Sequence, residues 1–367
     1  MKKIRLYIRV GCKIRASKSN NMKLTLPIPN GGIFILFMLL SFQVSSQDIH
    51  FSQFFETPLL RNPALAGIFT GDIRIQSVYR TQWNSVTVPY QTGSLNGEYK
   101  KPVGRGDDFL TIGAEILYDK AGTVALTATH ILPTINYHKS LSAERNMYLS
   151  LGFMGGWVQR SIDRSKVTTN SQYDGTGFNP GLADGETFLK NSYSYLDGSV
   201  GMSFNSQVGD NVDNNIFIGL AYHHFNKATK ISFYGNPNYE MIPKWVGSVG
   251  VRMNATDYSF ITIEGNYSKQ GPFTETIGGA MYSLKLDDIE DPKYLLHIGA
   301  FLRWKDAFIP VAKLEFKPLA VAVSYDANIS QLSAASHGRG GFELSLTYQK
   351  YLERNNSNKD AVRCPRF

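Results

Sequence analysis

The stretch QDIHFSQFFETPLLRNPALAGIFTGDIRIQSVYRTQW, residues 47–83, decides the fold of this chain. It contains an aromatic turn, two prolines and the tripeptide Asn62-Pro63-Ala64. Pro63 disfavours a helical conformation at Asn62, and the glycines that follow loosen the chain before apolar and polar residues begin to alternate. We therefore predict a short N-terminal plug or collar over residues 47–69, followed by a β-barrel.

Beyond this stretch, one segment after another alternates with a period of two, and Gly, Asn, Asp or Pro separates the segments. In 342–348, apolar residues occupy the even positions, whereas Glu343, Ser345 and Thr347 occupy the odd ones. Aromatic residues often end the apolar rows, as they do where lipid-facing strands meet the two membrane interfaces. About fourteen segments follow this pattern, centred on 72–82, 89–100, 108–118, 123–138, 146–160, 194–207, 215–226, 243–254, 257–269, 272–286, 293–305, 308–316, 318–326 and 339–351.

The connections between these segments agree with a membrane barrel. An even number of strands puts both termini on the periplasmic side, with long loops outside and short turns inside. The three longest predicted connections, about 161–193, 227–242 and 327–338, all follow odd-numbered segments. We therefore predict an all-β, transmembrane outer-membrane barrel of about fourteen antiparallel strands over residues 70–352.

A soluble β-sandwich is the alternative, because its strands also alternate. Sandwich strands average about six residues, and their apolar rows would face inward. The segments here reach ten residues or more and carry a continuous apolar face. The sequence therefore favours lipid outside the sheet.

The net charge of +8 comes from the start of the chain. Eight basic residues and no acidic ones precede Asp48: Lys2, Lys3, Arg5, Arg9, Lys13, Arg15, Lys18 and Lys23. Without them, the 38 basic residues fall to 30 and match the 30 acidic ones. A neutral mature chain gives no reason to expect a nucleic-acid partner.

Residues 1–46 are interpreted as a signal peptide. The apolar run 33–42 is too short to span a bilayer as a helix, and Val44-Ser45-Ser46 is a small-residue cleavage pattern. We expect the mature chain to begin at Gln47, and residues 1–21 to be a mis-assigned start if translation begins at Met22. Cleavage would remove Cys12 and leave Cys364 in a periplasmic tail, residues 353–367, without a disulfide partner.

Charged residues recur on the polar face that the barrel would turn inward. Buried charges need partners or water, so we expect ion pairs across a lumen occupied by the N-terminal segment. Whether that segment seals the lumen or projects toward the periplasm stays open at this point. The predicted lumen charge network comprises Arg74, Arg80, Glu115, Arg252, Glu264, Arg303, Lys313, Glu315 and Glu343.

Candidates for catalysis or cofactor binding are weak. His223 and His224 are adjacent, so on a strand they would face opposite sides and could not chelate one metal. The acidic run 287–291 lacks the glycine and the spacing of a calcium loop, and 338–341 does not follow a strand and open a helix as a phosphate-binding loop does. No Gly-x-Ser-x-Gly motif is present. We therefore expect no enzyme activity, cofactor, metal or catalytic residue.

The opening of the mature chain resembles the PorP/SprF family of Bacteroidetes over roughly its first quarter. The run QDIHFSQFFETPLLRNPALAG is followed by Tyr79-Arg80-x-Gln82-Trp83 and then by Pro89-Tyr90-x-Thr92. Ile49 departs from the family, which usually has proline there. The residues that carry the resemblance are Phe51, Ser52, Gln53, Pro58, Asn62, Pro63, Ala64, Gly67, Tyr79, Arg80, Gln82, Trp83, Pro89 and Tyr90.

The resemblance implies an outer-membrane component of the type IX secretion system, which exports large surface adhesins and supports gliding motility. It further implies that the partners are secreted adhesin substrates and periplasmic ring lipoproteins, in addition to outer-membrane lipid. A passive channel for hydrophobic or small solutes, similar to fatty-acid transporters, is the alternative. A barrel phospholipase is a third possibility, but the sequence offers no recognisable Ser and His pair for it.

Overall fold

The computed structural model describes residues 48–83, 88–104, 107–211, 214–236, 238–289, 291–331, 333–336 and 338–352. The predicted leader, the start at Gln47, both cysteines and the tail 353–367 lie outside these residues. No helix in the described part of the chain is long and apolar enough to cross a membrane.

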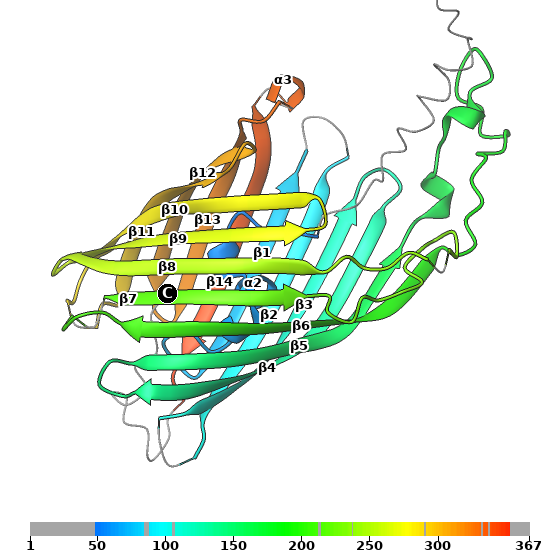
Figure 1. The fold of residues 1–367 in the computed structure, drawn as a ribbon. Helices are drawn as coiled ribbons and strands as arrows, with labels where there is room; N and C mark the ends of the chain where they lie inside the picture. Colours follow the sequence, from blue (N-terminus) through cyan, green and yellow to red (C-terminus); the bar gives the residue numbers. More distant parts are fainter. Residues whose placement is uncertain are drawn as a thin grey trace, which may run out of the picture. The chain divides into compact units, whose positions relative to one another are not determined.

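Fourteen antiparallel strands in the described residues close into one barrel (Figure 1). They are β1 (Ile73–Gln82), β2 (Tyr90–Pro102), β3 (Phe109–Ala121), β4 (Leu126–Ser142), β5 (Met147–Ser161), β6 (Ser192–Gln207), β7 (Asn215–His223), β8 (Lys244–Thr256), β9 (Ser259–Gln270), β10 (Phe273–Lys285), β11 (Tyr294–Arg303), β12 (Ala307–Phe316), β13 (Leu319–Asn328) and β14 (Arg339–Lys350). The short helical turns are η1 (Phe54–Glu56), α2 (Pro58–Arg61), η2 (Pro63–Leu65), η3 (Arg164–Lys166), η4 (Asn170–Gln172) and α3 (Ser333–Ser336).

Each strand pairs with its neighbours in sequence, and β1 pairs with β14 to close the barrel. Ile73 lies opposite Lys350, and Gln82 lies opposite Gly341. Closure leaves no strand edge unpaired. The predicted fold class is confirmed, and every predicted segment overlaps one strand.

The two faces of the wall differ in the way that the alternation predicts. Along β14, Leu344 and Leu346 are exposed by 42% and 49%, whereas Glu343 and Ser345 are buried in the interior. An apolar outer surface around a polar interior is the reverse of a soluble sandwich, so that alternative is wrong. It is the arrangement in which strands satisfy their backbone within the wall and present apolar side chains to lipid.

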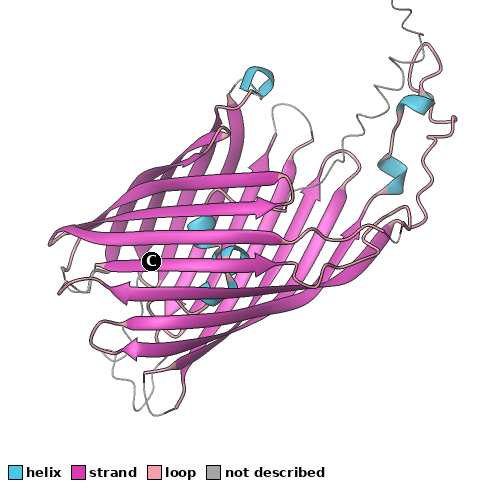
Figure 2. Ribbon diagram, in the orientation of Figure 1, coloured by secondary structure: helices cyan, strands magenta, loops and turns pink. Residues whose placement is uncertain are grey.

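The three longest connections are 162–191, 224–243 and 329–338, and all of them follow odd-numbered strands. They therefore leave the barrel at the same end, which we call the mouth; the other end, which holds the end of β14, is the base. Figure 2 shows η3 and η4 of the first connection beyond the strand ends. β7 ends at His223, three residues before the predicted end at 226, because His224 has φ +58° and turns the chain out of the strand.

The segment 48–72, which we call the plug, lies in the lumen with its three helical turns surrounded by strands (Figure 2). At the mouth, the Asp48 amide donates to Gln270 Oε1 at the end of β9. At the base, the Asp72 amide donates to the carbonyl of Lys350. The plug therefore runs through the lumen from the mouth to the base before the chain enters the wall.

The outer face predicts a depth-dependent cost for charge. Leu344→Arg, in the middle of β14, should lower the free energy of unfolding by about 2–4 kcal/mol because it places a cation against the lipid core. Thr256→Arg, at the base end of β8, should cost about 0–1 kcal/mol. Unfolding of the refolded barrel in lipid vesicles measures both, and equal costs would contradict a lipid-facing outer wall.

Candidate functional site

The interior contacts of the plug form the first part of the site, and they begin at the carboxylate of Glu343. Its two oxygens accept the backbone N–H groups of Ser52 and Gln53, at 2.6 and 2.7 Å. Arg80 Nη1 donates to the same carboxylate at 2.7 Å. One buried acid on β14 thus joins the plug to β1, with charge-assisted hydrogen bonds that are stronger than neutral ones.

Asp326 on β13 extends this cluster to β11. Its Oδ2 accepts from Arg80 at 3.1 Å and from Ser52 Oγ at 2.8 Å, and it also accepts from Arg303. All of these side chains are buried. Removing Arg80 would take away the cation that pairs with Glu343, and breaking a buried ion pair in this way typically costs about 3–5 kcal/mol.

Two further ion pairs hold the plug across the lumen. Glu56 lies 2.8 Å from Lys313 on β12, and that lysine also contacts Glu315 at 3.1 Å. Arg61 pairs with Glu264 on β9 at 2.7 Å, and its guanidinium stacks 4.9 Å from the ring centroid of Phe217. The plug is therefore fixed to β12 and β9 in addition to the strands of the Glu343 cluster.

The tripeptide Asn62-Pro63-Ala64 fits against glycines of the wall. Gly152, Gly201 and Gly219 lie on adjacent strands, β5, β6 and β7, and face inward. A Cβ at Gly152 would meet Pro63 and Ala64, and a Cβ at Gly201 or Gly219 would meet the amide of Asn62. The missing side chains make the space that this tripeptide occupies, and we call the three residues the glycine cradle.

The base of the plug is held by Glu98 and Lys100 on β2. Glu98 accepts from the amide of Gly67 at 2.7 Å and pairs with Arg74 at 2.7 Å. Gly67 has φ +83°, and a Cβ there would collide with Thr111, so both conformation and space require glycine. Lys100 Nζ donates to the carbonyl of Phe69 at 2.8 Å.

The nine predicted lumen charges all lie on inward-facing positions of their strands, but their partners differ. Glu115 accepts from Ser94 Oγ, and Arg252 stacks on Phe260 at 4.5 Å. The remaining seven join ion pairs, mostly with residues that the sequence analysis did not single out: Glu56, Arg61, Glu98 and Asp326. Glu98 and Asp326 could have been found, because they alternate in phase with inward serines on the same strands.

The family-motif residues divide between plug and wall. Those from Phe51 to Gly67 are buried in the lumen. Arg80 points inward, Tyr79 points outward with 44% exposure, and Gln82, Trp83, Pro89 and Tyr90 lie at the mouth end of β1 and β2. The motif therefore combines the plug with the strand that it contacts.

The histidine pair corrects one expectation. His223 and His224 do not face opposite sides; both are buried, because the chain turns at His224. His223 contacts Ser199 Oγ at 2.9 Å and the carbonyl of Arg61 at 3.4 Å. His224 lies between two carboxylates, 2.7 Å from Asp48 and 2.8 Å from Asp197.

The contact between His224 and Asp48, which we call the latch, fixes the plug at the mouth. Burial alone lowers the pKa of His224, but the charge of Asp48 and the hydrogen bonds to Asp197 and Asp48 outweigh it and raise the pKa to about 10. Burial alone would raise the pKa of Asp48, yet His224 and Lys244 hold it well below 3.8. Both groups are therefore charged at neutral pH.

The two longest connections, 162–191 and 224–243, form a second part of the site, which we call the loop platform. Phe188 stacks on Tyr234 at 4.8 Å between ring centroids, and the amide of Leu189 donates to the carbonyl of Phe233. Arg164 lies over Phe188 and pairs with Asp184 at 2.7 Å. The platform is thus held together by contacts between its two connections.

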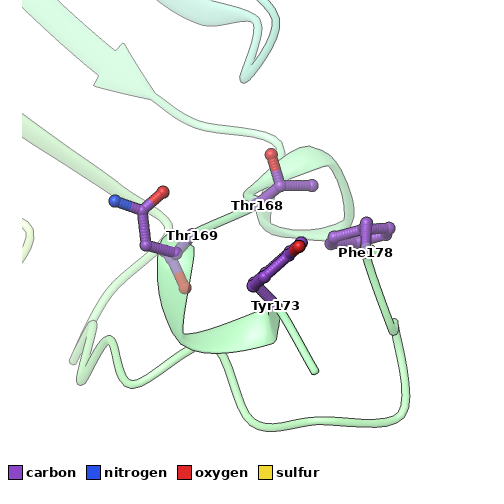
Figure 3. A pocket seen from close by; sticks show the side chains of 5 residues that line it. Thr168, Thr169, Tyr173 and Phe178 are labelled. Atoms are coloured by element: carbon purple, nitrogen blue, oxygen red, sulfur yellow. The ribbon is translucent and has the colours of Figure 1, made fainter. Parts of the chain in front are cut away.

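The outer part of the platform presents two aromatic rings. Tyr173 and Phe178 pair as a short β-bridge, and they are 61% and 57% exposed. With Thr168, Thr169 and Asn170, they line an open hollow of about 410 Å³ (Figure 3). Exposed aromatic residues beside small polar ones are typical of protein-binding surfaces.

The glycine cradle predicts a steric cost. Gly201→Ala should lower the free energy of unfolding by about 1–3 kcal/mol, because the new methyl group overlaps Asn62. The matched control is Gly247→Ala on β8, where a Cβ would meet no atom within 4 Å. Urea unfolding of the refolded barrel compares the two variants, and a similar loss in both would contradict the cradle.

The latch predicts a pH dependence. The contribution of His224, whose folded pKa is raised, is complete below pH 6.5 and is lost as the pH rises through about 10. The contribution of Asp48, whose folded pKa is lowered, is present above pH 3.8 and is lost as the pH falls further. The difference in unfolding midpoint between the wild type and His224→Gln should therefore be largest between pH 3.8 and pH 6.5, where both contributions are complete, and it should shrink toward pH 10. A difference that stays constant up to pH 11 would refute the latch.

Several solved structures are similar to this barrel. The toluene transporter TodX of P. putida has 9% sequence identity and a TM-score of 0.48, with 82% of this chain and 95% of that chain covered. A FadL homologue of Pseudomonas aeruginosa has 11% identity and a TM-score of 0.45, with 80% of this chain and 94% of that chain covered. The translocator domain of the autotransporter NalP from Neisseria meningitidis has 11% identity and a TM-score of 0.42, with 81% of this chain and 95% of that chain covered. No curated protein sequence matches this chain.

The family model described as type IX secretion system membrane protein PorP/SprF matches residues 43–348. This match covers all of the plug and nearly all of the wall, and it confirms the resemblance found in the opening motif. A membrane β-barrel of this family lies in the outer membrane. The chain belongs to the PorP/SprF family of type IX secretion system membrane proteins.

Proposed function

We propose that this protein is a non-catalytic accessory component of type IX secretion that assists the export and surface attachment of adhesin-type substrates, and thereby gliding, in a member of the Bacteroidetes. The single observation that carries this proposal is the family match over residues 43–348. In this proposal, the loop platform binds the substrate outside the cell, and the base contacts periplasmic ring lipoproteins.

The filled lumen supports a role that is carried out at the surfaces. The plug occupies the interior and contacts the wall through the Glu343, Glu56, Arg61 and Glu98 clusters. A large exported polypeptide would have to displace all of these contacts to pass through this barrel. The substrate therefore passes elsewhere, and this chain binds it from outside.

Both ends offer surfaces for such contacts. At the mouth, Tyr173 and Phe178 supply exposed aromatic side chains, the kind that dominates the binding energy of protein interfaces. At the base, the short connections expose single apolar side chains, namely Val208 at 51%, Tyr258 at 54% and Leu286 at 55%. These suit the smaller contacts of a ring protein below the membrane.

The passive-channel alternative has less support. A path for hydrophobic solutes needs an open apolar route, whereas the interior described here is occupied by the plug and lined by ion pairs. High ion conductance of the refolded barrel would favour this alternative.

Deletion of the gene should abolish surface retention of the adhesin, and the wild-type gene should restore it. The double variant Tyr173→Ser/Phe178→Ser should bind the adhesin at least about tenfold more weakly, because it loses two exposed aromatic contacts. Surface adhesin is scored by antibody labelling of intact cells.

Ile329→Ser is the matched control, since Ile329 is 53% exposed at the mouth but lies in the connection between β13 and β14. Normal export after deletion, in a strain with no second gene of this family, would overturn the proposed function. If deletion abolishes export but the double variant still retains normal amounts of adhesin on the surface, the proposed function stands. The binding surface then lies elsewhere on the protein.

A further inference from the structure

We propose that Arg160, on the inner wall at the mouth, binds a carboxylate group of a polypeptide partner, either a chain end or an acidic side chain. The proposal goes beyond the function above by naming the chemistry that the mouth recognises, and it rests on that function only for the identity of the partner. The hollow beside Tyr173 is a separate surface on the platform.

Arg160 differs from the arginines that hold the plug. Arg61, Arg74 and Arg80 each lie within 3.1 Å of a carboxylate. Among the described residues, no carboxylate forms an ion pair with Arg160. Its side chain hydrogen-bonds to Tyr193, but its Nε is buried without a hydrogen-bond partner. Buried donors are normally satisfied, and an unsatisfied one calls for a water molecule, an ion or a ligand.

A second unsatisfied nitrogen lies close by. His130 on β4 lies opposite Val158, and Arg160 lies opposite Ala128, so His130 and Arg160 are diagonal neighbours on the inner face. Such neighbours lie about 7–8 Å apart at the backbone, within reach of long side chains. His130 Nε2 is also buried without a partner. Two orphaned nitrogens thus occur on the same patch of wall.

A row of residues on four adjacent strands borders the guanidinium of Arg160. Asp119, Ala128, Arg160 and Tyr193 lie opposite one another in sequence across β3, β4, β5 and β6. Only the small Ala128 separates Asp119 from Arg160, and Tyr193 on the other side is its hydrogen-bond partner. Arg160 and Tyr193 are partly exposed, so an incoming group can reach them from the mouth.

The charges nearby select the ligand. Asp119 and Asp48 face the same region as Arg160, and both would repel a dianionic phosphate more strongly than a single carboxylate. The planar guanidinium matches the two oxygens of a carboxylate. The inward position of Arg160, below the strand ends, also keeps it from a flat lipid surface and suits an extended chain that enters the mouth.

The test uses the purified barrel in detergent and the fluorescent peptide dansyl-Gly-Leu-Phe, with either a free C-terminal carboxylate or a C-terminal amide. The wild type should bind the free acid at least about tenfold more tightly than the amide, as expected for a charge-assisted pair. Acetate should compete with the free acid more effectively than inorganic phosphate does. Arg160→Gln should remove the difference between acid and amide, and Arg160→Lys should restore part of it.

Arg164→Gln is the matched control, because Arg164 lies in the loop platform but is already paired with Asp184. This variant should keep the preference for the acid, and the unfolding midpoints of all variants show whether the barrel stays intact.

Equal binding of acid and amide by the wild type, or an unchanged preference in Arg160→Gln, would overturn the proposal. Stronger competition by phosphate would also overturn it and would point to a phosphorylated ligand. Because binding is measured on purified protein, normal export after gene deletion would refute the proposed function without touching this site.

Discussion

A closed barrel in lipid has to turn its polar side chains inward, and each buried charge then needs a partner. This constraint explains the plug better than any single contact does. Three glutamates of the wall have partners in the plug. Glu343 accepts two backbone amides, Glu264 pairs with the guanidinium of Arg61, and Glu98 accepts the amide of Gly67. Because a buried charge without its partner costs several kcal/mol, wall and plug stabilise each other and neither is complete alone.

Shape imposes a second condition on the same interior. The plug passes through the lumen in short turns, and Asn62-Pro63-Ala64 lies directly against the wall. Glycine in a strand is unfavourable by itself, yet three glycines face inward where this tripeptide sits. The local cost in the strands is offset by the close packing that their missing side chains permit. The family motif and the glycine cradle are therefore two halves of one contact.

The wall could be predicted from the sequence because alternation with a period of two is a local signal. Each predicted segment overlaps one strand, and the three longest connections all lie at the mouth of the barrel. The inward position of residues such as Arg80 and Glu343 followed from the same alternation. Their partners did not follow, because pairing across the lumen joins residues more than two hundred positions apart, as in Arg61 and Glu264. The turn at His224 also escaped the pattern, since a single positive φ reverses the side to which a residue points.

The distribution of ion pairs and exposed aromatic side chains separates the structural interior from the mouth. In the middle of the lumen, Arg80 and Glu343 bind one another and the plug, so their bonding capacity is used within the chain. At the mouth, Arg160 and His130 retain unsatisfied nitrogens, and Tyr173 and Phe178 remain exposed. Ion pairs between the wall and the plug fix the middle of the barrel, whereas the mouth offers exposed aromatic rings and an arginine that forms no ion pair with the described carboxylates. The interior ion pairs therefore account for stability, and the mouth is where a partner would gain the most from contact.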